Sequence, residues 1–189
     1  MPYQSFEKTE IEGVYRIQPK VFGDERGWYC AELEMAEFKS ATGICLRITQ
    51  IASSFNSKKG ILRGLHYQKP ETQGKLVEVI SGSVQDVAVD IRKGSSTFGK
   101  VVSAILTAKD HNQLWVPPGC AHGYLALVDN TRFCYTITDG FYTTANEKGV
   151  NPFDPDLKID WLIPRDQLIL KDRDLNFKDL KNIPDVDLL

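Results

Sequence analysis

Short runs of apolar and β-branched residues, separated by glycine, proline and polar turns, recur along the first three quarters of the chain. Several of these runs alternate apolar with polar positions, and they are short, which is typical of β-strands. About ten such runs without alternating helices indicate an all-β sandwich or barrel. The predicted strands span 13–17, 28–33, 45–54, 61–68, 75–80, 84–91, 101–106, 113–116, 123–127 and 132–138.

The segment KLVEVISGSVQDVAVDI, residues 75–91, joins two of these strands through Ser-Gly-Ser at 81–83. A short turn that contains glycine between two such strands predicts a β-hairpin. In the second arm, apolar side chains alternate with acidic or small ones, so the pattern has one polar face. The apolar positions are Val87, Val89 and Ile91, and the others are Asp86, Ala88 and Asp90.

The rest of the chain adds one predicted helix and a long irregular segment. The helix is expected at about Glu34 to Ala41. After Thr144 the chain becomes rich in Asn, Asp and Pro, as in NPFDPDLKIDW, which indicates irregular structure wrapping a barrel. The sequence has no internal repeat and no convincing linker, so a single domain is predicted over residues 1–189.

Composition narrows the class of protein. The 189 residues include 42% hydrophobic and 25% charged residues, with a net charge of -2, as in an ordinary globular protein. This charge argues against nucleic acid or a polybasic membrane surface as the main partner. Because there is no run of about 18 apolar residues and no basic, apolar leader, a soluble cytoplasmic protein is expected. The four cysteines lack a CxxC pattern, which favours free thiols over zinc or disulfides.

Two spacings of glycine and histidine resemble the two halves of the cupin barrel signature. Gly60 precedes His66 in GILRGLHYQ, and PPGCAHG places His122 in a P-x-G-x-x-H pattern. Many cupins bind a metal with a second histidine and an acid near the first histidine. Here Gln68 and Lys75 stand near those places, and an amide and a cation are poor metal ligands. No metal site is therefore predicted.

The side chains of these strands suit acid–base chemistry on an organic substrate. A neutral imidazole such as His66 accepts protons near neutral pH, and a carboxylate can orient it. Lysine or arginine can stabilise negative charge on a substrate oxygen, and a tyrosine can return the proton. Base, cation and acid together describe proton abstraction next to a carbonyl. Taken alone, each residue also has a structural interpretation. His66 could be a hydrogen-bonded structural histidine, Lys75 a surface lysine whose methylene groups cover apolar residues, and Tyr135 a core or interface ring.

Arg63 and His66 present a geometric difficulty. They are three positions apart, so a regular strand would point them to opposite faces. Gly64 lies between them and permits a bulge that would turn both side chains inward. Without that bulge, Arg63 would belong to another surface or another subunit.

From about Phe6 to Lys178 the chain resembles the dTDP-4-dehydrorhamnose 3,5-epimerase family, which are metal-independent cupins. The resemblance is carried by PKVFGDERG, KKGILRGLHYQ, QGKLVEV, DVAVDIRKGSSTFGK, QLWVPPGCAHGYLAL, FCYTITD and LILKDRD, in this order. It implies a cupin-type jelly-roll barrel with a few short helices, mainly near the C-terminus. It also implies a homodimer whose N-terminal strands cross to the partner's sheet, and no cofactor.

The resemblance further implies roles for particular residues. His66 corresponds to the catalytic base and Asp174 to the aspartate that pairs with it. Tyr135 corresponds to the acid on the opposite face of the sugar, and Lys75 to the lysine near the C4 oxygen. The residues that correspond to substrate-binding positions are Arg63 and His122 in the same pocket, Arg26 and Gln50 at the diphosphate, Phe141 at the base, and Phe22 in PKVFGDERG.

Three positions depart from the family pattern, and all three lie around the nucleotide. Ala31 stands where an acid is usual, with Glu32 one residue later. Ala52 stands in place of the usual asparagine after Gln50, in a segment one residue longer. Phe141 replaces a tyrosine, which keeps the ring face for stacking and loses the hydroxyl. The chemistry is therefore better supported than the identity of the base.

These observations predict an isomerase that converts dTDP-4-dehydro-6-deoxy-D-glucose into dTDP-4-dehydro-L-rhamnose. The alternatives are an epimerase acting at C3 only or at C5 only, a 3,4-ketoisomerase of a related nucleotide sugar, and a sugar-binding cupin without activity.

Overall fold

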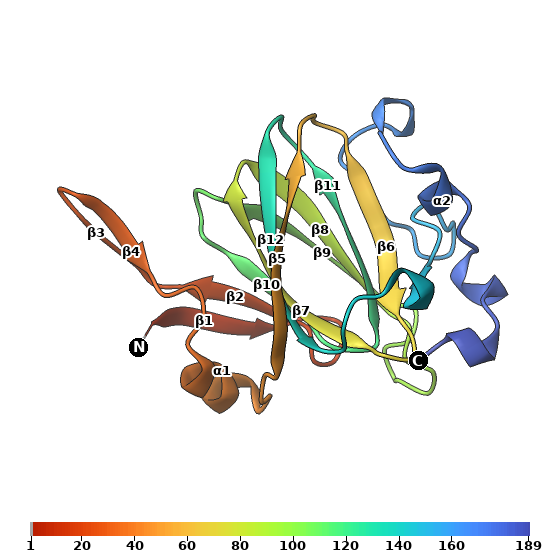
Figure 1. The fold of residues 1–189 in the computed structure, drawn as a ribbon, viewed down its shortest axis with the longest axis horizontal. Helices are drawn as coiled ribbons and strands as arrows, with labels where there is room; N and C mark the ends of the chain where they lie inside the picture. Colours follow the sequence, from red (N-terminus) through yellow and green to blue (C-terminus); the bar gives the residue numbers. More distant parts are fainter. Residues whose placement is uncertain (1) are drawn as a thin grey trace.

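The computed structural model describes residues 2–189, and its core is two antiparallel sheets that face each other (Figure 1). The fold is all-β and of the cupin-type jelly-roll class, as predicted. In spatial order, the six-stranded sheet contains β1 (Tyr3–Lys8), β2 (Tyr15–Pro19), β10 (Gln113–Val116), β7 (Gln73–Ser81), β12 (Thr131–Asp139) and β5 (Ile48–Asn56). The five-stranded sheet contains β13 (Glu147–Gly149), β6 (Leu62–Gln68), β11 (Cys120–Ala126), β8 (Ser83–Asp90) and β9 (Val101–Thr107).

A separate hairpin of β3 (Val21–Asp24) and β4 (Gly27–Cys30) projects away from the barrel (Figure 1). Its side chains are largely uncovered: Trp28 is 59% exposed and Tyr29 67% exposed. Large apolar rings in this state usually mark a surface that another molecule covers. Contacts within one chain therefore do not account for the exposed rings of this hairpin.

The predicted helix is confirmed as α1, Met35–Thr42. The Glu34 carboxylate caps it by accepting from the Ala36 and Glu37 amides, and Gly43 ends it with a φ of 77°. Phe38 is fully buried and packs edge-on against Trp115 of β10, with ring centroids 5.5 Å apart. The helix thus covers the outer face of the six-stranded sheet near the N-terminus.

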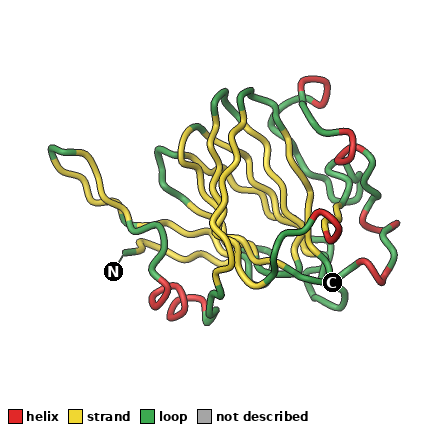
Figure 2. Tube along the Cα trace, in the orientation of Figure 1, coloured by secondary structure: helices red, strands yellow, loops and turns green. Residues whose placement is uncertain are grey.

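The C-terminal segment wraps the barrel, as predicted, and carries most of the short helices (Figure 2). They are η1 (Thr144–Asn146), η2 (Arg165–Gln167), α2 (Asp172–Leu175), η3 (Leu180–Asn182) and η4 (Asp185–Asp187). Its apolar residues, among them Leu157, Leu180 and Ile183, pack with Val87 and Val89 of β8. Val87 and Val89 point outward under this segment. The alternate side chains of β8, which form its polar face, therefore point into the barrel and not toward solvent.

Strand β6 contains the bulge that Gly64 permits in the sequence. Its pairing with β11 joins His66 to His122 and Arg63 to Tyr124, so β6 holds one extra residue between the two pairs. Gly64, inside the bulge, has a φ of 123°, which disfavours any side chain. The bulge lets Arg63 and His66 line one cavity despite their odd spacing.

Some strand predictions were incomplete. Strands β1, β3 and β13 were not predicted, and the strand expected at 28–33 ends at Cys30. The chain leaves the sheet there because Glu34 begins the helix cap. Within residues 2–189, the structure has no helix that is long and apolar enough to cross a lipid bilayer.

Gly64→Ala should lower the free energy of unfolding by about 3 kcal/mol or more, measured by urea denaturation. A Cβ there would lie 2.5 Å from Gly123 Cα and 2.9 Å from the His122 backbone oxygen. The resulting overpacking costs about 1–3 kcal/mol, and the positive φ adds backbone strain of about 1–2 kcal/mol. Gly94→Ala is the control, since Gly94 also has a positive φ of 88° but nothing within 4 Å. Equal losses in the two variants would contradict the tight packing of the bulge.

Candidate active site

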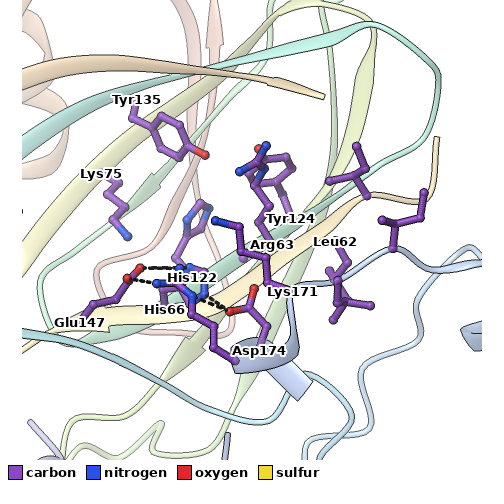
Figure 3. Close-up of a pocket in the computed structure, with 15 residues that line it drawn as sticks. Leu62, Arg63, His66, Lys75, His122, Tyr124, Tyr135, Glu147, Lys171 and Asp174 are labelled. Atoms are coloured by element: carbon purple, nitrogen blue, oxygen red, sulfur yellow. Dashed lines mark hydrogen bonds and ion pairs between the residues drawn. The ribbon is translucent and has the colours of Figure 1, made fainter. Parts of the chain in front are cut away.

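The cavity that holds the predicted residues lies between the two sheets and has a volume of about 350 Å³ (Figure 3). Its lining comes from β6, β7, β11, β12, β13 and the C-terminal segment around α2. The side chains that it gathers are Ile61, Leu62, Arg63, His66, Lys75, His122, Tyr124, Tyr135, Glu147, Ile169, Leu170, Lys171, Arg173 and Asp174. A second hollow of about 260 Å³ shares His66, Lys75, Tyr135 and Glu147 and extends toward Gln50 and Tyr142.

His66 of β6 is paired with Asp174 of α2, with 2.8 Å between His66 Nε2 and Asp174 Oδ1. The Gly64 amide donates to the other carboxylate oxygen at 3.3 Å. Burial raises the pKa of Asp174, but the hydrogen bond and charge of His66, the Gly64 amide and Arg173 outweigh it, and the net pKa is lowered. The C-terminal segment thus brings an ionised carboxylate to a histidine 108 positions earlier in the chain.

A second carboxylate lies at the other ring nitrogen of His66. Glu147 Oε1 is 3.6 Å from His66 Nδ1. Arg173 binds both acids: its Nε donates to Asp174 at 3.2 Å and its Nη2 to Glu147 at 3.1 Å. Tyr142 also donates to Glu147, at 3.0 Å. Glu147 and Arg173 were not predicted, although Arg173 adjoins Asp174 in KDRD; Glu147 begins β13, a strand of only three residues.

Lys75 extends from β7 with its ammonium directed into the cavity (Figure 3). Burial lowers the pKa of Lys75 to about 8, while the charges of Glu147 and Asp86 act in the opposite direction. The side chain is therefore a cavity group and not a surface lysine. An ammonium with little water around it interacts strongly with any negative oxygen placed beside it.

Tyr135 stands on β12, in the sheet opposite His66, and both side chains line the same cavity (Figure 3). Its hydroxyl is 3.3 Å from Ser54 Oγ. Burial raises the pKa of Tyr135 well above its ordinary value, so the phenol keeps its proton at neutral pH. A ligand in the cavity therefore meets an imidazole from one sheet and a phenol from the other.

Arg63 and His122 complete the cavity, and each is held by a neighbour. Arg63 Nε donates to Asn56 Oδ1 at 3.0 Å. His122 Nε2 lies 2.8 Å from Asp86 Oδ1, and both side chains are buried. Lys171, at the rim, adds a cation that was not predicted.

The residues expected at the nucleotide are dispersed in the single chain. Gln50 and Ala52 line the second hollow. Phe141 is 62% exposed and does not line either hollow. Phe22 and Arg26 lie on the projecting hairpin, where Arg26 pairs with Asp24 of the same hairpin. One chain alone therefore does not bring Phe22 and Arg26 to His66.

The possible metal ligands are otherwise engaged. Among residues 2–189, no three His, Cys, Asp or Glu side chains are grouped so that they could hold a metal ion. Gln68, which stands where many cupins have a histidine, accepts from the Thr143 amide at 3.2 Å. The polar groups of this cavity are two imidazoles, two phenols, several cations, and carboxylates that are paired with His66 and Arg173.

The fold and cavity define a cupin-type barrel that collects proton-accepting and proton-donating side chains around one ligand-sized space. The sequence profile of the dTDP-4-dehydrorhamnose 3,5-epimerase family matches residues 8–182. The chain belongs to this family.

Individual relatives agree with this assignment. The dTDP-4-dehydrorhamnose 3,5-epimerase of Shigella flexneri is 46% identical over 170 residues, which cover 89% of this chain and 92% of that protein. A crystal structure of the Legionella pneumophila dTDP-6-deoxy-D-glucose-3,5-epimerase in complex with dTDP-4-keto-L-rhamnose has a TM-score of 0.92 and 41% identity, covering 97% and 96% of the two chains. A 3'-monoepimerase from Streptomyces bikiniensis in complex with dTDP-quinovose has a TM-score of 0.81 and 33% identity, covering 90% and 85%.

Lys75→Met should be more stable than the wild type at pH 7, because the buried charge is lost while the stem is kept. The folded pKa of about 8 lies below the ordinary 10.5, so the cost of burying the charge is fully present below pH 8 and disappears as the pH rises toward 10.5. Urea unfolding of both proteins at pH 7 and pH 9.5 measures this. A stability difference that does not shrink at pH 9.5 would contradict the lowered pKa.

Proposed function

We propose that the chain catalyses the 3,5-epimerisation of dTDP-4-dehydro-6-deoxy-D-glucose to dTDP-4-dehydro-L-rhamnose. The observation that carries this proposal is the placement of His66 and Tyr135 on opposite sheets around one cavity. A single group that removes and returns a proton on the same face cannot invert a carbon. Two groups on opposite faces are the minimum for inversion.

In the proposed reaction, the C4 ketone acidifies the hydrogens on both neighbouring carbons. His66 removes the proton from one of these carbons, and the electron pair moves into an enolate with its charge on the C4 oxygen. Tyr135 then delivers a proton to the carbon from the other face, which inverts the centre. After His66 has released its proton to solvent water and Tyr135 has regained one from it, the same sequence at the second neighbour completes the double epimerisation. Asp174 orients His66 and stabilises the imidazolium that forms.

The charge on the enolate oxygen is the species that the cavity must stabilise. Lys75, directed into the cavity, is the cation that we assign to this oxygen. Its low solvation strengthens that interaction, and one such pre-aligned donor contributes roughly 3 kcal/mol in comparable sites. His122, held by Asp86, borders the same region and supports the sugar.

The nucleotide would occupy the open side of the cavity. Gln50 stands at the hollow that adjoins the cavity, and Arg26 from a second copy of the chain would suit the diphosphate, because an arginine fork pairs with two oxygens at once. Phe141 offers an exposed ring for stacking on the base.

The proposed active form is a homodimer in which each projecting hairpin reaches the partner's cavity. This accounts for two observations: the exposed rings of the hairpin, and the projection of β3 and β4, which carry Phe22 and Arg26 between them, away from the barrel (Figure 1). We also propose a cytoplasmic location, supported by the four free thiols, which a reducing compartment maintains.

An epimerase of C3 alone is the second candidate. It is supported by the similarity to the 3'-monoepimerase structure and by the three departures around the nucleotide.

Incubation with dTDP-4-dehydro-6-deoxy-D-glucose in heavy water separates these candidates. The double epimerase should incorporate deuterium at C3 and C5 and yield the L-configured sugar by NMR. His66→Asn and Tyr135→Phe should each lower turnover by about 10²–10⁴-fold, because each removes one proton-transfer group, with unchanged circular dichroism. Deuterium at one carbon only would favour the monoepimerase, a moved carbonyl would favour the ketoisomerase, and full activity of either variant would favour a binding protein.

Mixing two variants that are impaired in different ways, and assaying the mixture at a substrate concentration below KM, tests the hairpin exchange. Arg26→Ala should raise KM by about tenfold or more, since a charge-assisted hydrogen bond contributes about 1.5–3 kcal/mol. After unfolding and refolding together, Arg26→Ala and His66→Asn chains should form mixed dimers with one intact site, built from the His66 of one chain and the Arg26 of the other. Activity no greater than the sum of the separate variants would contradict the exchange.

A further inference from the structure

A row of polar side chains leads away from the Tyr135 phenol and is not used by the reaction described above. Ser54 Oγ lies 3.3 Å from Tyr135 Oη and 2.7 Å from Tyr124 Oη. Tyr124 in turn donates to Asn56 Oδ1 at 3.2 Å. We call Ser54, Tyr124 and Asn56 the hydroxyl chain. It comes from β5 and β11, on opposite sheets, and its Tyr124 lines the cavity.

The direction of each hydrogen bond follows from counting hydrogens. Tyr124 has one hydroxyl hydrogen and gives it to Asn56, so Tyr124 Oη accepts from Ser54. Ser54 also has one hydrogen, which is thereby used, so Ser54 Oγ accepts from Tyr135. In this arrangement the phenol proton points at Ser54.

Asn56, at the far end of the hydroxyl chain, has a fixed orientation and can lose the hydrogen bond that Tyr124 donates to it. Asn56 Nδ2 donates to the Thr131 oxygen at 3.2 Å, which sets the orientation of the amide. Asn56 Oδ1 accepts from Arg63 Nε at 3.0 Å as well as from Tyr124. If Tyr124 turns away, this buried oxygen keeps a charged donor and no acceptor is left unsatisfied.

We propose that Ser54 and Tyr124 are positioning residues whose hydroxyl hydrogens reverse direction when Tyr135 gives up its proton. The inference rests on the proposed function, in which Tyr135 is the acid. The Tyr135 O–H bond breaks and a C–H bond forms on the sugar. Ser54 then rotates its hydrogen to the phenolate, and Tyr124 rotates its hydrogen to Ser54. Both hydroxyls keep their own protons, and the phenolate later regains one from solvent water.

The environment of Tyr135 explains why such a response matters. Burial and Tyr124 raise the pKa of Tyr135, whereas Ser54 and Arg63 lower it. A phenolate in this site is costly unless a donor turns toward it as the charge forms. Ser54 supplies that donor when the hydrogen bonds of the hydroxyl chain reverse. Asn56 then keeps its hydrogen bond from Arg63, and the positive charge of the guanidinium supports the reversed arrangement.

The test compares Ser54→Ala and Tyr124→Phe with wild type, on the dTDP-4-dehydro sugar in heavy water. We expect kcat to fall about tenfold to hundredfold, the effect of losing one hydrogen bond to a charged group, with KM changed by less than about twofold. His66 still forms the enolate, so deuterium should accumulate in recovered, uninverted substrate relative to inverted product. Ser54→Thr, which keeps a hydroxyl, should restore the wild-type ratio. The double variant should be no slower than the slower single variant, because both act through one chain.

Ser53→Ala and Tyr3→Phe are matched controls, because they remove hydroxyls that contact Arg132 and the Glu34 amide outside the cavity. They should leave both the rate and the ratio unchanged. Wild-type inversion rates in Ser54→Ala and Tyr124→Phe, or slower rates with an unchanged ratio, would overturn the hydroxyl chain. A wild type that inverts neither carbon would refute the proposed function itself.

Discussion

The burial of charged groups inside a small β-barrel is the constraint on which the rest of this structure depends. A jelly-roll interior is ordinarily apolar, and an unpaired charge there is strongly unfavourable. In this barrel the His66 imidazole lies beside the Asp174 and Glu147 carboxylates, and Arg173 binds both. The C-terminal segment is therefore more than a cover for the outer face, because it carries Asp174 and Arg173 into the site.

The same constraint explains how the two faces of β8 are used. Val87 and Val89 face outward and are sealed by the C-terminal segment. Asp86 is directed inward to His122, while Val84 and Ala88 belong to the apolar core of the barrel. The Asp86–His122 pair thus lies between apolar side chains on the inward face of β8, and His122 also lines the cavity.

Much of this arrangement was predictable from local pattern. Most of the strands followed from short apolar runs, and Gly64 between Arg63 and His66 indicated the bulge that turns both side chains inward. Asp174 was found only through family resemblance, because a contact across 108 positions leaves no local signal. Glu147 was missed because a three-residue strand has no periodicity to detect. Phe22 and Arg26 were identified by resemblance alone, and within one chain they lie on the β3–β4 hairpin, outside the cavity that holds His66.

The two proposed proton-transfer groups differ most in what surrounds them. The two ring nitrogens of His66 lie beside the Glu147 and Asp174 carboxylates, which orient the ring as a proton acceptor. Tyr135 has hydroxyl and aromatic neighbours instead, and burial raises its pKa, so it stays protonated until a carbanion-like carbon faces it. These different surroundings support the roles that we propose, with His66 as the base and Tyr135 as the acid. In the proposed reaction a proton therefore passes from the sugar to the imidazole on the five-stranded sheet, and another passes to the sugar from the phenol on the six-stranded sheet.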